Sequence, residues 1–103
     1  HQFRIDTTDG IGRPTPEGAH RDGVDFVAVL LVARKGIKGG ETRVFDADGP
    51  SGQRFTLTRP WSALLLDDHR VIHESTPIQP IDAAGHRDTL VLTYRSGAFQ
   101  GED

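Results

Sequence analysis

The sequence predicts an all-β fold, either a sandwich or a barrel. Its apolar residues occur in short runs rich in β-branched side chains, and in several runs apolar and polar residues alternate. Glycine (12 residues) and proline (6 residues) are plentiful and form turn signals between the runs. No helical periodicity extends beyond two turns. Six or seven short strands separated by frequent turns are typical of sandwiches and barrels.

The individual strands are predicted from these runs in order along the chain. Residues 26–32 (FVAVLLV) are continuously apolar, which indicates a strand buried on both faces. Residues 42–45 and 53–58 alternate polar and apolar side chains, as half-exposed strands do. The other predicted strands are residues 2–5, 62–66, 70–74 and 89–94. Pairs such as Gly39-Gly40 and Asp67-Asp68 indicate the turns between them.

The length of the chain predicts one domain, residues 1–103. The first residue is histidine, and residues 6–23 offer little that would cover the edges of a sheet. We therefore expect a fragment that lacks N-terminal elements of a longer fold.

Composition argues against several classes of partner. The net charge is −3, so there is no basic excess to neutralise a nucleic acid backbone. The longest apolar run, residues 26–33, is far too short to span a membrane, and no signal peptide is visible. Cysteine is absent, which excludes disulfides and thiolate metal sites. A cytoplasmic location is the resulting prediction.

A candidate metal site begins with the triplet His20-Arg21-Asp22. Alternate residues of an extended chain point to the same side, so the imidazole and the carboxylate can face one ion. His73, 53 residues after His20, supplies a second imidazole from a predicted strand. Two histidines and one carboxylate form the facial triad of non-haem Fe(II) oxygenases, which leaves coordination positions open. Alone, an H-x-D triplet is weak evidence, because most such pairs are surface polar groups.

Arg87 and Thr89 form a candidate site for a carboxylate at the start of the last strand. A guanidinium binds a carboxylate through two parallel charge-assisted hydrogen bonds. The hydroxyl two residues later faces the same side and can donate a third. Such a site suits the distal C5 carboxylate of 2-oxoglutarate, whose other end chelates iron. Taken alone, Arg87 is better explained as a surface charge; the metal triad reverses that preference.

His69 is the rival of His73 as the third metal ligand. Four residues apart on a strand, the two histidines share a face but lie roughly 13 Å apart, so they do not bind one ion together. His73 is favoured because it lies within the strand and precedes Arg87 by 14 residues. His86, which neighbours Arg87, is expected to be solvated.

Four blocks of the sequence together resemble the 2OG-Fe dioxygenase family that contains bacterial free amino-acid hydroxylases, such as isoleucine 4-hydroxylase-like enzymes. The blocks are PTPEGAHRDG (14–23), GGET (39–42), DDHRVIHESTPI (67–78) and RDTLVLTY (87–94), in the expected order. The resemblance implies a double-stranded β-helix, also called a jelly roll. It also implies that His20, Asp22 and His73 bind the metal and that Arg87 binds the C5 carboxylate.

The resemblance implies a function as well. With Fe(II), 2-oxoglutarate and O₂, such an enzyme hydroxylates a C–H bond of a small substrate and releases succinate and CO₂. The substrate that the resemblance implies is a free L-amino acid. One alternative is a cupin-like metal enzyme, an isomerase or zinc hydrolase, because zinc also accepts two histidines and a carboxylate. Another is a non-catalytic module that binds metal and 2-oxoglutarate. Arg87 argues against a hydrolase, which needs no site for a distal carboxylate.

The sequence does not choose the substrate. Four charged residues are candidates to bind the amino and carboxylate groups of an amino acid, and none stands out from ordinary surface charges: Arg4, Arg59, Arg70 and Glu17. Trp61 is expected to be a core or edge aromatic rather than a substrate platform.

Overall fold

The computed structural model describes residues 1–96, and this part of the chain contains nine β-strands. Their bounds are β1 (Gln2–Asp6), β2 (Phe26–Lys35), β3 (Ile37–Gly39), β4 (Thr42–Asp46), β5 (Gly52–Phe55), β6 (Ala63–Asp67), β7 (Val71–Ser75), β8 (Ile78–Pro80) and β9 (His86–Tyr94). Nowhere in residues 1–96 is there a helix of the length and apolar character that crossing a membrane requires. The predicted all-β class is confirmed.

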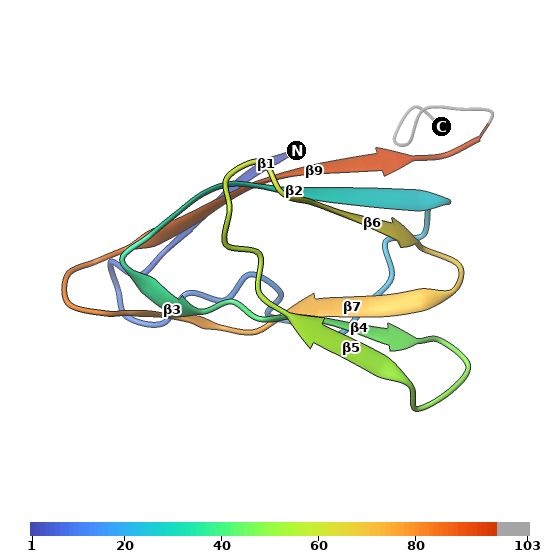
Figure 1. Ribbon diagram of the computed structural model, residues 1–103, viewed down its shortest axis with the longest axis horizontal. Coiled ribbons are helices and arrows are strands. Elements are labelled where there is room, and N and C mark those ends of the chain that lie inside the picture. Colours follow the sequence, from blue (N-terminus) through green and yellow to red (C-terminus); the bar gives the residue numbers. More distant parts are fainter. Residues whose placement is uncertain (97–103) are drawn as a thin grey trace.

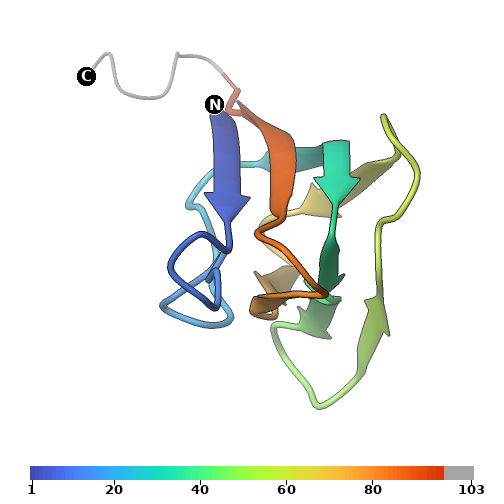
Figure 2. The same ribbon diagram turned by 90° about the vertical axis from the view of Figure 1, so that its left-hand side faces the viewer.

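The strands form two facing layers (Figure 1). One layer, the major sheet, is antiparallel with the strand order β1-β9-β2-β6. The opposite layer contains the minor sheet, β5-β4-β7, and the separate strand pair β3-β8. Figure 2 shows β1 and β9 side by side, so the first and last strands are neighbours in the major sheet. Distant parts of the sequence therefore meet in each layer.

The hydrophobic core lies between the two layers. Val27 of β2 and Leu66 of β6 are buried with Val24, and Val44 and Val71 of the minor sheet pack against this cluster. Burial of such aliphatic side chains contributes about 1.5–3 kcal/mol each. The core therefore joins the major sheet to the minor sheet.

The outer face of the major sheet is partly apolar and exposed. Phe26 is 56% exposed, Leu65 77% and Tyr94 52%, and they project away from the core because side chains alternate along a strand. The prediction that residues 26–32 are buried on both faces is therefore only partly right. Val27, Ala28 and Leu31 are buried, whereas Phe26 lies at an open surface.

A β-bulge interrupts β2 where it pairs with β9. The register shifts between Leu31 and Ala33, so β2 carries one extra residue there. An extra residue reverses the face that the following side chains take. Leu31 is fully buried in the interior, and beyond the bulge Arg34 lies directly opposite Arg87 of β9. The bulge thus decides which side chain joins Arg87 on the inner face.

The segment between β1 and β2 lies along the edges of two strands. Gly12 forms an antiparallel bridge with Ile78 of β8, and His20 forms one with His73 of β7. A Cβ atom at Gly12 would lie 2.7 Å from Ile5 Cγ2, so this close approach requires glycine. The expectation that residues 6–23 offer little to cover a sheet edge is therefore wrong.

All seven predicted strands are present, with shifted ends. The strand predicted at 53–58 ends at Phe55, and the one predicted at 89–94 begins at His86. Two strands of three residues, β3 and β8, were not predicted. β3 ends in glycine and β8 in proline, residues that weaken the strand signal of a short segment.

Candidate metal centre

His20 and His73 face each other across an antiparallel bridge, although 53 residues separate them. The His20 N–H donates to the His73 carbonyl at 2.9 Å, and the His73 N–H donates to the His20 carbonyl at 3.0 Å. Directly opposed residues in such a pair place their side chains on the same face. The two ring centroids are accordingly 4.5 Å apart. Strand pairing therefore brings the two imidazoles together.

The Asp22 carboxylate lies between the two rings. Its Oδ1 atom is 3.4 Å from His20 Nε2, and its Oδ2 atom is 3.3 Å from His73 Nε2. One ligand atom from each of the three residues lies within 4.8 Å of the others. Two nitrogens and one oxygen that bind one ion at about 2.1 Å need a separation of roughly 3–4 Å. The three side chains therefore have the spacing of a compact metal site.

The backbone fixes the orientation of the His20 ring. Its Nδ1 atom is 3.1 Å from the Gly18 carbonyl, which accepts a hydrogen bond when Nδ1 carries the ring proton. In that tautomer the lone pair is on Nε2, the atom that faces Asp22 and that a metal ion would bind. Glu17 Oε1 also lies 3.4 Å from Nδ1. The surroundings of His20 thus favour the tautomer that binds a metal.

Asp68 holds the loop that carries Asp22. Its carboxylate accepts hydrogen bonds from the backbone N–H groups of Asp22, Gly23 and Val24 at 2.8–3.0 Å. Its side chain is fully buried. Burial alone would raise the pKa of Asp68, but these three donors and the nearby Arg21 outweigh it and the pKa is lowered. The carboxylate is therefore charged and anchors the loop.

In the sequence, Asp68 is visible only as part of a turn signal, which does not reveal this role. A carboxylate beside a buried strand was the available signal, but the loop that it binds lies 46 residues away from it at Asp22. Such a contact is visible only in the folded chain.

His73 is held as a neutral imidazole. Burial lowers its pKa, and the neighbouring His20 lowers it further, while Asp22 acts in the opposite direction. A neutral ring has a free lone pair, which is the form that binds metal ions. The environment of His73 therefore suits metal binding at neutral pH.

A cavity of about 280 Å³ adjoins the three side chains and also contains the predicted carboxylate site. Arg87 and Thr89 of β9 are 5% and 6% exposed and line it with Val91, two residues further along the same face. The remaining lining residues are Phe3, Ile5, Pro14, Thr15, Glu17, His20, Asp22, Val29, His73 and Ser75. Arg87 is thus buried at the site and is not a surface charge.

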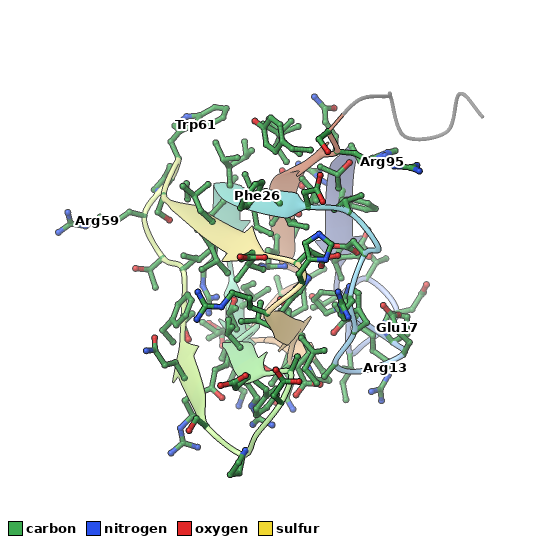
Figure 3. All side chains as sticks on the ribbon, turned by 90° about the vertical axis from the view of Figure 1, so that its right-hand side faces the viewer. Arg13, Glu17, Phe26, Arg59, Trp61 and Arg95 are labelled. Atoms are coloured by element: carbon green, nitrogen blue, oxygen red, sulfur yellow. The ribbon has the colours of Figure 1, made fainter. Side chains whose placement is uncertain are left out.

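The other residues considered from the sequence lie elsewhere, apart from Glu17. His69 Nε2 is 2.7 Å from Asp25 Oδ1, and its side chain is 62% exposed. Arg4 forms a two-hydrogen-bond ion pair with Asp88 at 2.8 Å. Arg59 and Trp61 lie on the opposite side of the molecule from Glu17 in Figure 3, and Arg59 points away from the protein.

Comparison of the chain with known protein families identifies the kind of domain that has this geometry. The model of the 2OG-Fe dioxygenase family matches residues 1–93. The chain belongs to this family. Membership implies Fe(II), 2-oxoglutarate and O₂ as cofactor and cosubstrates, and it confirms the family predicted from the four sequence blocks. A set of one carboxylate oxygen and two imidazole nitrogens, with no thiolate, fits Fe(II).

Three solved structures resemble this 2OG-Fe dioxygenase chain. A bsmA homolog from Methylobium petroleophilum PM1 is 70% identical with a TM-score of 0.92, and the match covers 99% of this chain and 42% of that one. IDO from Bacillus thuringiensis has 22% identity, a TM-score of 0.79, and coverage of 94% and 47%. The Fe(II)/(alpha)ketoglutarate-dependent dioxygenase TqaL has 24% identity, a TM-score of 0.80, and coverage of 97% and 42%.

The last two likenesses concern the fold, and they confirm the predicted jelly roll. The chain spans less than half the length of each of these proteins. No curated protein matches the sequence.

Proposed function

We propose that the chain is the core domain of an Fe(II)- and 2-oxoglutarate-dependent hydroxylase, with His20, Asp22 and His73 as the metal ligands. The observation that carries the proposal is the convergence of these side chains on a cavity that also contains the buried Arg87. A hydrolase that uses the same three ligands has no need of a site for a distal carboxylate. The absence of cysteine accords with a cytoplasmic location, which is part of the proposal.

Each lining residue has a defined task in this proposal. Fe(II), 2-oxoglutarate and O₂ supply the oxidation, in which 2-oxoglutarate becomes succinate and CO₂ and one oxygen atom enters a substrate C–H bond. The guanidinium of Arg87 binds the C5 carboxylate through two hydrogen bonds, and the Thr89 hydroxyl donates another. Val29 and Val91 provide apolar walls that exclude water from the reacting groups.

The substrate that we propose is a small molecule with an amino group, such as a free amino acid. Among the four charged candidates from the sequence, Glu17 lines the cavity, whereas Arg70 lines a separate hollow. The Glu17 side chain is 56% exposed and adjoins His20, so it is open to an incoming ammonium group. A carboxylate binds an ammonium group through charge-assisted hydrogen bonds. The volume of about 280 Å³ also favours a small substrate.

The test of the function is turnover of 2-oxoglutarate with a panel of free L-amino acids. We expect succinate release with Fe(II) and ascorbate, and a product heavier than the substrate by one oxygen atom. Zn(II) in place of Fe(II) and the Asp22→Ala variant are the negative controls. Binding of 2-oxoglutarate without succinate would identify a non-catalytic module. Turnover of a substrate with Zn(II) and without 2-oxoglutarate would identify a cupin-like enzyme instead.

The proposed role of Glu17 is tested by Glu17→Gln. We expect KM for the amino-acid substrate to rise about tenfold, because one charge-assisted hydrogen bond is weakened. Glu41→Gln, a change in a carboxylate that pairs with Arg43, is the matched control and should leave KM unaltered. If metal affinity falls while KM stays the same, Glu17 orients His20 and does not bind substrate.

A further inference from the structure

A second arginine, Arg34, stands beside Arg87. The two residues are directly opposite in the pairing of β2 with β9, so their side chains leave the sheet on the same face. A Cβ atom built at Gly40 would lie 3.5 Å from Arg34 Nη1 and 3.7 Å from Arg87 Cδ. Both side chains therefore pack around this glycine, next to the end of the cavity that Arg87 lines.

No carboxylate in residues 1–96 neutralises either guanidinium. Arg34 Nη2 donates to the Gly39 carbonyl at 3.0 Å, but its Nη1 atom is buried with no hydrogen-bond partner. Burial, followed by the charge of Arg34, lowers the pKa of Arg87. Two like charges without a counter-ion destabilise a folded protein, and the cost is greatest where water is excluded. A bound anion would neutralise the two guanidinium groups and so remove this cost.

We propose that Arg34 is a positioning residue of the 2-oxoglutarate site, whose positive charge strengthens the hold of Arg87 on the distal carboxylate. The inference rests on the proposed function and adds a second cation to it. Arg34 Nη2 donates to the Gly39 carbonyl, and Arg34 does not line the cavity, so its effect on the anion is exerted through its charge and through Arg87 rather than by direct contact. At an effective dielectric constant of about 20, unit charges roughly 7 Å apart still interact appreciably.

This role separates Arg34 from an ordinary structural arginine. A structural residue stabilises the protein in the absence of ligand, so its loss lowers the melting temperature. A partly buried charge that awaits an anion destabilises the ligand-free protein, so its removal leaves the melting temperature unchanged or raises it. The two roles therefore predict opposite effects on the ligand-free protein.

The test compares Arg34→Gln, Arg34→Met and Arg34→Lys with the unchanged full chain. The dissociation constant of 2-oxoglutarate is measured by calorimetry with Mn(II) in place of Fe(II), so that binding is separated from turnover. We expect the two neutral variants to bind 2-oxoglutarate about tenfold more weakly and Arg34→Lys to stay within about threefold. Mn(II) affinity without 2-oxoglutarate should not change, and the ligand-free melting temperature should not fall.

Several results would overturn the inference. Neutral variants that bind 2-oxoglutarate as tightly as the unchanged chain would remove Arg34 from the site. Equal weakening in the neutral and lysine variants, or neutral variants that do not fold, would make its role structural. If Arg87→Met loses 2-oxoglutarate binding and the Arg34 variants do not, the inference about Arg34 fails, but the proposed function stands. Failure of the unchanged chain to bind 2-oxoglutarate with Mn(II) present would instead contradict the proposed function itself.

Discussion

At the scale of single residues, the candidate metal site depends on two histidines whose side chains lie beside one carboxylate. Strand pairing aligns His20 and His73, and the Gly18 carbonyl selects the tautomer of His20. Asp22 lies within 3.4 Å of both rings. Each of these contacts involves only a few groups, so changes in single side chains have sharply different expected effects.

The choice between the two histidines of the β7 region is tested by His73→Ala and His69→Ala. We expect His73→Ala to weaken Fe(II) or Mn(II) binding by at least about 100-fold, because one of three ligands is lost. His69→Ala should leave metal affinity unaltered, because that ring pairs with Asp25. Calorimetric titration with Mn(II) measures both. The opposite ranking of the two variants would contradict the ligand assignment.

The carboxylate site is tested by Arg87→Met, with Arg4→Met as its matched control. Loss of the Arg87 guanidinium should weaken 2-oxoglutarate binding roughly 100-fold, since two charge-assisted hydrogen bonds disappear in a buried site. Arg4 forms its ion pair on the exposed side of the major sheet and is 61% exposed, so its removal should not affect binding. The KM for 2-oxoglutarate and its dissociation constant both report the effect. Equal values for the two variants would exclude the proposed clamp.

At the scale of elements, carboxylates hold the loops between strands in place. Asp68 caps the three N–H groups at residues 22–24, and Asp25 joins the start of β2 to His69 and to the Ser96 N–H. These contacts cross large sequence distances. They place the ligand loop against the strands and so couple the metal site to fold stability.

Asp68→Asn tests the anchor of the ligand loop. The amide keeps the size of the side chain but loses the charge. Its NH₂ group would also face three backbone N–H groups, which are themselves donors. We expect a loss of about 2–4 kcal/mol in the free energy of unfolding and weaker metal binding, because Asp22 is no longer held. The neighbouring Asp67→Asn is the control, since Asp67 accepts one bond from the His69 N–H. The free energy of unfolding is measured in urea, and equal losses in the two variants would contradict this role.

The contact of Asp25 predicts a specific pH dependence. The hydrogen bond from His69, followed by that from the Ser96 N–H, lowers the pKa of Asp25 from 3.8 to about 2. Because the pKa is lowered in the folded state, the contribution to stability is present above about pH 4, falls as the pH drops through about 2, and is lost near about pH 1. Asp25→Asn should therefore reduce stability at about pH 6, and the difference should shrink steadily below about pH 4 and vanish near about pH 1.

Urea unfolding over this pH range measures the difference between the two proteins. Asp82→Asn, a change at an exposed position, is the control and should follow the unchanged protein throughout. A difference between Asp25→Asn and the unchanged protein that does not shrink between about pH 4 and about pH 1 would contradict the assignment.

At the scale of the whole molecule, the site lies between the two layers of the fold. His73 comes from the minor sheet, whereas Arg87 and Thr89 come from the major sheet (Figure 1). A cosubstrate bound to both the metal and Arg87 therefore links the layers. Ligand binding should accordingly stabilise the fold as a whole rather than one strand.

Thermal unfolding tests this coupling. At 100 times its dissociation constant a ligand adds about 2.7 kcal/mol, which raises the melting temperature of a domain this small by roughly 10 °C or more. We expect this rise for 2-oxoglutarate with Mn(II) present and little rise without the metal. Glutarate, which has both carboxylates but lacks the chelating 2-oxo group, is the matched control. An equal shift from glutarate, or a metal-independent shift, would contradict binding across the layers.

Much of the site was predictable because its residue types carry their chemistry. The H-x-D triplet, His73 and the pair Arg87 and Thr89 were identified from spacing and from the resemblance to the family, and the folded chain brings all of them to one cavity. The alternation of side chains along an extended chain does not by itself explain how His20 and Asp22 face the same point. Asp22 lies outside any strand and is positioned by hydrogen bonds to Asp68, not by alternation in an extended strand.

The strand-forming segments, the turns between them and the types of the candidate ligands follow from the sequence, because they depend on short-range patterns of polarity and on the chemistry of single side chains. Which distant segments pair is settled only in the folded chain. That pairing placed His73 opposite His20, brought Asp68 under the ligand loop and, through the bulge in β2, turned Arg34 toward Arg87. Register and bulges are set by contacts across the whole fold, and for that reason no local pattern encodes them.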